Sequence, residues 1–265
     1  MDRNPAQIIT LLTDFGLRDP YVGQMKGVIL GILPEARIVD LTHDIAPQDV
    51  FDGAYVLKSS YHYFPRGTVH VAVVDPGVGT ERKAIALRAD GHCFVVPDNG
   101  IVSLITAETP PAEVVELTNR KYFLPAVSWT FHGRDIFAPV AAHIASGIAL
   151  TEFGEALGEI EKLDLPRPRH DRQCVRGEVI HIDRFGNLIT NIRASDLVMM
   201  RLSHCEVRVA DKTLSGVKSS YSAVKKGELL ALFGGTGLLE VSVNQGNAAA
   251  LLRLDKGAHV EVIPR

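Results

Sequence analysis

The 265-residue chain has few cysteines and no long apolar run, and each absence excludes a class of protein. Cys93, Cys174 and Cys205 lie far apart and form no CxxC pair, so we predict neither a disulfide framework nor a structural zinc site. An odd cysteine count is typical of a reducing compartment. No apolar run reaches the ~18 residues of a membrane-spanning helix, and the N-terminal segment lacks the apolar region of a signal peptide. We therefore expect a soluble, cytoplasmic protein with no membrane partner.

Strong charge and the common cofactor motifs are also missing. There are 28 basic and 31 acidic residues, which give a net charge of -3, and no basic stripe favours a nucleic-acid partner. Neither GxxxxGK[ST] nor a GxGxxG that opens a helix occurs, which argues against a phosphate loop and a dinucleotide site. The ten histidines show no HExxH and no paired spacing, so we expect no catalytic metal.

What is present favours an α/β fold in the first part of the chain. Hydrophobic residues make up 46% of the sequence, which is enough for a sizeable core. Strand-like apolar runs alternate with amphipathic helical patterns, and this alternation predicts a mostly parallel central sheet. The predicted strands are 8–12, 36–42, 68–75, 84–89 and 93–98, with 114–117 as one more candidate, and the predicted helices are 21–34, 50–61 and 133–147. We expect Pro139 to kink the last helix or to move its start.

The pattern changes near residue 161. The stretch "EKLDLPRPRHDRQC" carries two prolines, many charges and few apolar residues, as linkers do. Short strand candidates follow, with no convincing helix among them, so a small all-β barrel or sandwich is expected. We predict an N-terminal α/β domain over 1–162, a linker over 163–175 and a C-terminal β-barrel over 176–265.

Acidic residues follow three of the predicted parallel strands. They are Asp14, Asp75 and Asp98, and ligands of α/β folds bind at the carboxyl ends of such strands. A single aspartate there could simply cap a turn or a helix. Three at equivalent places favour a ligand site. Arg82 follows the turn-forming stretch after Asp75, and on its own it could be a surface residue.

Two further stretches are candidates for site loops. "SWTFHGRDIF" (128–137) places His132 among aromatic residues before a helix, where a lone histidine is usually structural. "IDRFGNLITN" contains Asp183 and Asn187, and it fits either a hairpin turn or a site with an aromatic face and an amide. The glycine-rich stretch that starts at residue 234 is a similar candidate.

Six motifs in order carry a resemblance to a known family. They are "TLLTDFG", "VVDPGVGTERK", "VVPDNG", "TFHGRD", "DRFGNLITN" and "VNQGNAA". Together they resemble the S-adenosyl-L-methionine hydroxide adenosyltransferases, in the superfamily of the fluorinase and the chlorinase. The resemblance runs from about residue 8 to 263. It implies an N-terminal α/β domain, a C-terminal β-barrel and a homotrimer with sites between subunits.

The resemblance also implies a reaction and a set of site residues. Water-derived hydroxide attacks the ribose C5′ of S-adenosylmethionine and releases adenosine and methionine, with no cofactor besides this substrate. The family's Asp-Arg-His set falls on Asp75, Arg82 and His132 as catalytic residues. The substrate-binding residues that it implies are Asp14, Asp183, Asn187, Tyr221, Gly235 and Thr236.

Two other functions remain open from the sequence. One is a halide adenosyltransferase, but those enzymes resemble this chain less, because a tyrosine stands where this chain has Asp75. Gly133 does not separate the two activities, because the chlorinase also has glycine there. The other is a non-catalytic regulator that binds S-adenosylmethionine or adenosine, which would have no need of the complete Asp75, Arg82 and His132 set.

Overall fold

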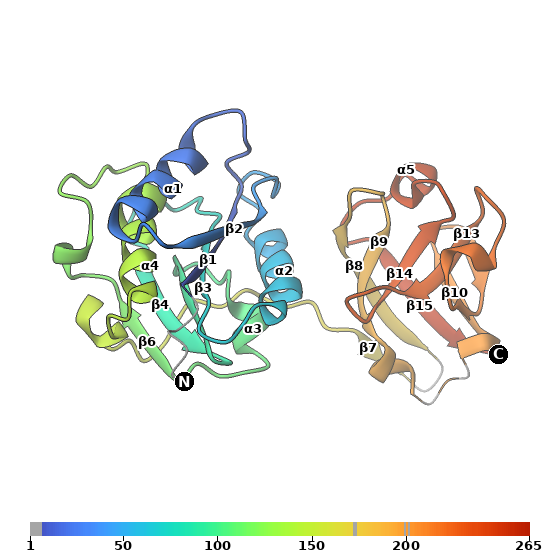
Figure 1. The fold of residues 1–265 in the computed structure, drawn as a ribbon. Helices are drawn as coiled ribbons and strands as arrows, with labels where there is room; N and C mark the ends of the chain where they lie inside the picture. Colours follow the sequence, from blue (N-terminus) through green and yellow to red (C-terminus); the bar gives the residue numbers. More distant parts are fainter. Residues whose placement is uncertain (1–6, 172–173, 199, 201) are drawn as a thin grey trace, which may run out of the picture. The chain divides into compact units, whose positions relative to one another are not determined.

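Two units follow each other along the chain, Met1–Asp164 and Leu165–Arg265. Figure 1 shows helices and strands in the first unit and mostly strands in the second. Each unit has a buried apolar core of its own side chains. The computed structural model describes residues 7–171, 174–198, 200 and 202–265.

A six-stranded sheet forms the centre of the first unit. Its order is β2-β1-β3-β5-β4-β6. Neighbours from β2 to β5 pair in parallel, whereas β4 pairs antiparallel with both β5 and β6. The prediction of a mostly parallel sheet is therefore confirmed. The strands are β1 (Ile8–Thr13), β2 (Arg37–Thr42), β3 (Val69–Val73), β4 (Ala84–Ala89), β5 (His92–Pro97) and β6 (Glu113–Glu116).

Helices cover both faces of this sheet, because its strands are apolar on both sides. One core joins α1 and α4 to one face through Met25 and Val140, and the other joins α2 and α3 to the opposite face through Leu57 and Ile105. The helices are α1 (Tyr21–Ile32), α2 (Val50–Ser60), α3 (Ser103–Thr106) and α4 (Ala138–Ala145). Among the described residues, no helix combines the length and apolar character that crossing a bilayer requires.

The segment predicted as one helix over 133–147 consists of two parts. Gly133–Phe137 forms a π-helical turn, and α4 begins after it at Ala138. Pro139 lies in the first turn of α4, and the carbonyl oxygen of Asp135, four residues earlier, accepts instead from Leu124 N at 3.0 Å. The proline therefore moves the start of the α-helix, one of the two outcomes expected from the sequence.

The topology brings the strand ends with acidic residues to one edge of the sheet. β1, β3 and β5 are adjacent and parallel, so Asp14, Asp75 and Asp98 all follow the same edge. Because β4 runs in the opposite direction, it starts at that edge, and Arg82 lies two residues before its first residue, Ala84. Arg82, which comes before the antiparallel strand β4, therefore lies at the same edge as the aspartates, which come after parallel strands.

The second unit is a nine-stranded, nearly closed barrel-like sheet. Its order is β11-β10-β15-β8-β9-β14-β13-β12, with β7 paired to β8. All its pairs are antiparallel except β12 with β13. The expected all-β barrel is confirmed. The strands are β7 (Arg169–His170), β8 (Val175–Ile182), β9 (Leu188–Arg193), β10 (Cys205–Val209), β11 (Lys212–Ser215), β12 (Val217–Lys218), β13 (Leu229–Phe233), β14 (Leu238–Val243) and β15 (His259–Pro264).

Two details of the second unit differ from the sequence-based expectation. A short helix, α5 (Ala248–Leu252), follows β14, and the side chain of Asn247 caps it by accepting from Ala250 N at 2.7 Å. Its five residues are too few to show helical periodicity in the sequence. The stretch predicted as a linker, 163–175, contains β7, which adds a short strand to the edge of β8.

Candidate active site

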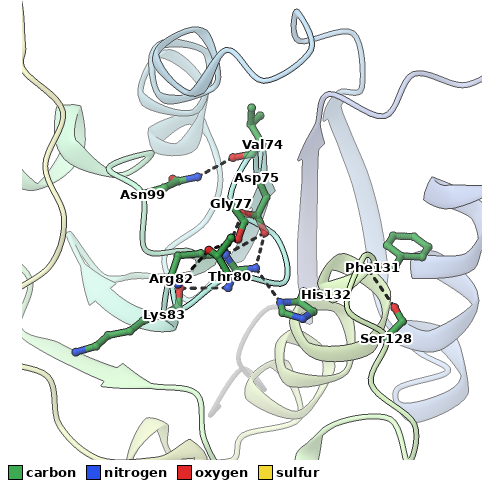
Figure 2. Close-up of polar contacts among 10 residues, drawn as sticks. All are labelled: Val74, Asp75, Gly77, Thr80, Arg82, Lys83, Asn99, Ser128, Phe131 and His132. Atoms are coloured by element: carbon green, nitrogen blue, oxygen red, sulfur yellow. Dashed lines mark hydrogen bonds and ion pairs between the residues drawn. The ribbon is translucent and has the colours of Figure 1, made fainter.

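The loop after β3 holds two of the predicted catalytic residues (Figure 2). Asn99 Nδ2 donates to the carbonyl oxygen of Val74 at 2.8 Å and so fixes the end of the strand just before Asp75. The Thr80 hydroxyl donates to Gly77 O at 2.6 Å and closes the turn that follows. This turn reverses the chain and delivers Arg82 beside Asp75.

Gly79 joins this loop to the one that carries His132. Its φ is +76°, a conformation that favours glycine, and a Cβ atom there would lie 2.3 Å from the carbonyl oxygen of Trp129. Any side chain at this position would push the two loops apart. The glycine therefore permits the close approach of Trp129, and with it His132, to the loop of Asp75 and Arg82.

Asp75, Arg82 and His132 form one hydrogen-bonded group (Figure 2). Arg82 Nε lies 2.9 Å from Asp75 Oδ1, and Arg82 Nη2 forms an ion pair with Asp75 Oδ2. The same Nη2 lies 2.9 Å from His132 Nδ1. The side chains of Asp75 and Arg82 are only 5% and 10% exposed, so water screens this pair weakly. The guanidinium also lies 5.4 Å from the ring centroid of Phe137.

This geometry determines the tautomer of His132. An arginine guanidinium only donates hydrogen bonds, so His132 Nδ1 must be the acceptor. The neutral imidazole then carries its proton on Nε2. Burial, and next the positive charge of Arg82, lower the pKa of His132 below the ordinary 6.5, which keeps the ring neutral at neutral pH.

A buried aspartate holds the loop of His132. Asp135 accepts from Ser128 N at 2.8 Å and from Arg134 Nε at 2.7 Å. Burial acts to raise the pKa of Asp135, but the hydrogen bonds from Arg134 and Ser128 outweigh it and lower the pKa. Phe131 N donates to the Ser128 hydroxyl at 3.0 Å (Figure 2), which completes the loop.

Asp14 lies at the same sheet edge, in the loop after β1. Its Oδ2 accepts from Gln48 N at 2.8 Å, and Oδ1 is left to accept from a ligand. Beside it, Phe15 packs edge-to-face against Tyr21 and Phe131, with centroids 5.9 and 5.8 Å away. Phe131 precedes His132, so this aromatic cluster connects the Asp14 loop with the His132 loop.

His43 supports the Asp14 loop, and the sequence analysis missed it. Its Nδ1 lies 2.9 Å from Thr13 Oγ1, its carbonyl accepts from Gly16 N at 2.8 Å, and its Nε2 lies 3.1 Å from Asp40 Oδ1. His43 thereby contacts both residues that flank the Asp14–Phe15 pair. The sequence feature that could have identified His43 is its position directly after a strand, in "DLTH".

Asp98 has a different role from the other two strand-end aspartates. Its Oδ1 accepts from Glu161 N at 2.9 Å and so ties the end of the first unit to β5. Burial, opposed in part by this bond, raises the pKa of Asp98. The ordinary structural explanation, an aspartate that satisfies a backbone N–H, accounts for Asp98.

In the second unit, Asp183 and Asn187 lie together in the turn between β8 and β9. Asp183 Oδ1 accepts from Phe185 N and Asn187 N, each at 2.9 Å, and Asp183 Oδ2 accepts from Asn187 Nδ2 at 2.8 Å. The hairpin turn expected from this motif is therefore present. It also leaves the ring of Phe185 74% exposed beside a carboxylate and an amide, as a ligand-stacking face requires.

Tyr221 contacts a carboxylate that the sequence analysis did not single out. The hydroxyl of Tyr221 donates to Glu240 Oε1 at 2.5 Å. Gly235 and Thr236 form the turn between β13 and β14, and Glu240 is in β14. The sequence feature that could have identified Glu240 is an acidic residue inside the apolar run "LLEVSV".

Within the described residues, no group of three or more His, Cys, Asp and Glu side chains has the arrangement to hold a metal ion. In the first unit, a carboxylate is oriented by an arginine, with a histidine N–H beside it. This arrangement can hold a water molecule and accept its proton.

Comparisons with known proteins agree with these features. The family model of the SAM hydroxide adenosyltransferase N-terminal domain matches residues 9–154, and that of the C-terminal domain matches 177–261. The chain is 40% identical to the (R)-S-adenosyl-L-methionine hydrolase of Salinispora tropica, over 97% of this chain and 98% of that protein. It is 38% identical to the Methanocaldococcus jannaschii protein of the same name, over 97% and 95%.

A fluorinase and a solved structure are also similar. The fluorinase of an Actinoplanes species is 32% identical over 74% of this chain and 75% of that protein. The crystal structure of an uncharacterized conserved protein from Thermotoga maritima has a TM-score of 0.91 and 40% identity, and the match covers 96% of this chain and 99% of that one. With both family domains matched in order, the chain belongs to the S-adenosyl-L-methionine hydroxide adenosyltransferase family.

Proposed function

We propose that this protein hydrolyses S-adenosyl-L-methionine to adenosine and L-methionine, by attack of water on ribose C5′. The observation that carries the proposal is the contact of Arg82 with both Asp75 and His132. The names of the relatives with 38–40% identity over nearly the whole chain support the same reaction.

The chemistry of the substrate explains which groups are needed. The oxygen of water forms a bond to C5′ while the bond from C5′ to the sulfonium sulfur breaks, and its electron pair stays on sulfur. The leaving group is a neutral thioether, so it needs no proton from a general acid. The water loses one proton, first to an acceptor in the site and then to solvent. The site must therefore orient a poor nucleophile and accept its proton.

Asp75 is the acceptor in this proposal. Arg82 Nε contacts both Asp75 oxygens and Nη2 contacts Oδ2 as well, so Oδ1, with one arginine partner, keeps a lone pair for water. His132 Nδ1 is occupied by Arg82, so its Nε2–H is a donor that can hold the water oxygen. Arg82 keeps both partners oriented and is not itself a proton acceptor.

The substrate-binding roles follow the family resemblance. We propose that Asp14 accepts from the ribose hydroxyls, and that Asp183 and Asn187 contact the methionine ammonium and the adenine region. Tyr221 stacks on adenine. The methionine carboxylate is bound by backbone N–H groups at Gly235 or by the Thr236 hydroxyl. In this scheme S-adenosylmethionine is the substrate, and neither a cofactor nor a metal takes part.

The division of these residues between two units supports a shared site. Asp14 and Asp75 belong to the first unit, whereas Asp183 and Asn187 belong to the second. We propose a homotrimer in which the first unit of one subunit and the second unit of its neighbour complete each site. We also propose a cytoplasmic location, supported by three buried cysteines that form no disulfide.

Product analysis tests the reaction. Pure protein is incubated with S-adenosylmethionine, with and without chloride, and the products are separated by chromatography. We expect adenosine and methionine in both conditions. 5′-Chloro-5′-deoxyadenosine as the main product would instead support a halide adenosyltransferase, and tight binding without turnover would support a regulator.

A further inference from the structure

Glu240 is a buried carboxylate that the proposed reaction does not use. It lies inside β14, is 5% exposed, and has apolar neighbours in Leu239 and Val241. An ionised side chain in such surroundings is costly unless it is paired. The contacts of its carboxylate should therefore show what stabilises Glu240 in this buried position.

One partner is Tyr221. The distance of 2.5 Å between Tyr221 Oη and Glu240 Oε1 is typical of a hydroxyl that donates to an ionised carboxylate. Burial, and next this hydrogen bond, raise the pKa of Tyr221 to about 12, so the phenol keeps its proton and remains the donor. Part of Tyr221 is accessible, because the residue is 41% exposed. Glu240 therefore holds the hydroxyl of a partly exposed ring.

The other side of the carboxylate supports the turn before β14. A Cβ atom on Gly234 would lie 2.4 Å from Glu240 Oε2, so a side chain at this position would displace the carboxylate from its place beside the turn. Gly235 and Thr236 follow directly. The negative charge of Asp183 also contributes to the raised pKa of Glu240 and of Tyr221.

We propose that Glu240 is a positioning residue that fixes the Tyr221 ring, and the adjoining Gly234 turn, in the orientation that binds the adenosyl group. This inference rests on the proposed binding role of Tyr221. A tyrosine held at its hydroxyl loses less rotational freedom when a ligand stacks on it, so fixing it in advance strengthens binding. Glu240 acts through Tyr221 and does not touch the reacting atoms.

Three variants test this role: Glu240→Ala, Glu240→Gln and Tyr221→Phe. The readouts are KM and kcat with S-adenosylmethionine, and Kd for adenosine by calorimetry. We expect Glu240→Ala to raise both KM and the adenosine Kd roughly 3- to 10-fold, with kcat within about twofold of the parent. Glu240→Gln keeps an oxygen acceptor for Tyr221 and should restore most of the affinity.

The coupling between the two residues separates positioning from a purely structural role. Tyr221→Phe should weaken adenosine binding about as much as Glu240→Ala, and the double variant should be scarcely weaker than the worse single one. Tyr63→Phe, a change at an exposed tyrosine of the first unit, is the matched control and should bind normally. If Glu240→Ala does not fold, Tyr221→Phe and Glu240→Gln still report on the hydrogen bond.

The outcomes distinguish this inference from the proposed reaction. Unchanged adenosine affinity in folded Glu240→Ala and Tyr221→Phe would overturn the positioning role, even if the parent hydrolyses its substrate. A parent protein that binds no adenosine would overturn it as well. Weakened adenosine binding in both variants would support it even if no hydrolysis is detected, in which case only the reaction would be wrong.

Discussion

Arg82 donates to His132 Nδ1 at 2.9 Å while it holds the carboxylate of Asp75. Because the guanidinium cannot accept, this contact orients the imidazole with its proton on Nε2. In the proposed mechanism, His132 is therefore the hydrogen-bond donor to the attacking water, and Asp75 accepts the proton of that water.

Replacing Asp75 tests the assignment of the acceptor. Asp75→Asn keeps the shape of the side chain but removes its charge, so the attacking water loses its proton acceptor. We expect kcat to fall roughly 10²- to 10⁴-fold, the usual contribution of general-base assistance, while the Kd for adenosine changes little. Single-turnover kinetics and calorimetry on the same preparation measure the two effects.

Asp98→Asn is the matched control, since Asp98 follows the neighbouring parallel strand. Its carboxylate accepts from Glu161 N, so the change should lower the melting temperature and leave kcat close to that of the parent. The catalytic assignment of Asp75 would be wrong if Asp75→Asn behaved in this way, less stable but fully active.

The pH dependence of the rate should report on His132. Protonation would put a proton on Nδ1, which removes the acceptor for Arg82 and places two positive charges side by side. Because burial and Arg82 lower the pKa of His132, the loss of activity at low pH should have its midpoint below pH 6.5. The asparagine in His132→Asn can accept from Arg82 but does not titrate, so we expect this variant to be slower and to show no such loss of activity at low pH. If His132→Asn lost activity at low pH as the parent does, a group other than His132 would be responsible.

A buried histidine pair at the starts of β3 and β5 should make the fold sensitive to acid. His70 Nδ1 lies 2.7 Å from Thr10 Oγ1, and His70 Nε2 lies 3.2 Å from His92 Nδ1. Burial, and next the charge of His92, lower the pKa of His70 to about 3. Below pH 6.5 the unfolded chain binds a proton that the folded chain does not. The free energy of unfolding should therefore be constant above pH 6.5 and fall as the pH decreases toward 3.

Urea unfolding at several pH values measures this effect. One such group contributes a slope of about 1.4 kcal/mol per pH unit within that window. His70→Asn should be less stable at pH 7 and should show a shallower pH dependence below 6.5. His62→Asn, at an exposed position, should retain the parent slope. Equal slopes in His70→Asn and the parent would contradict this explanation.

Mixed oligomers test the shared site. Asp75→Ala and Asn187→Ala should each be inactive, but in a trimer of mixed subunits some sites combine an intact first unit with an intact second unit. Co-refolding the two variants should therefore restore part of the activity, measured as adenosine released. A fully active monomer in light scattering would rule out this arrangement.

Much of the first site could be predicted because it depends on local pattern and topology. Apolar runs that end in aspartate indicate parallel strands with acidic ends, and adjacent parallel strands place Asp14 and Asp75 at one edge. The same argument could not separate Asp98, because its partner, Glu161 N, comes from a distant irregular segment. The pairing of Arg82 with His132 depends on the close approach of Gly79 to Trp129, which no local pattern encodes.

The residues missed by sequence reasoning have long-range partners as well. His43 is recognisable only once β1 and β2 are adjacent and its ring meets Thr13. Glu240 is an acidic residue in an apolar strand, and its purpose is visible only when Tyr221 donates to it. The turn of Asp183 and Asn187 was readable from the sequence, because its hydrogen bonds join residues that are four positions apart.

The origin of the new oxygen atom tests the central claim most directly. The parent protein is incubated with S-adenosylmethionine in ¹⁸O-labelled water, and the adenosine is examined by mass spectrometry with fragmentation of the ribose. Attack of water on C5′ predicts one ¹⁸O atom per adenosine, located at the 5′ position. Unlabelled adenosine, or a label in methionine instead, would contradict the account.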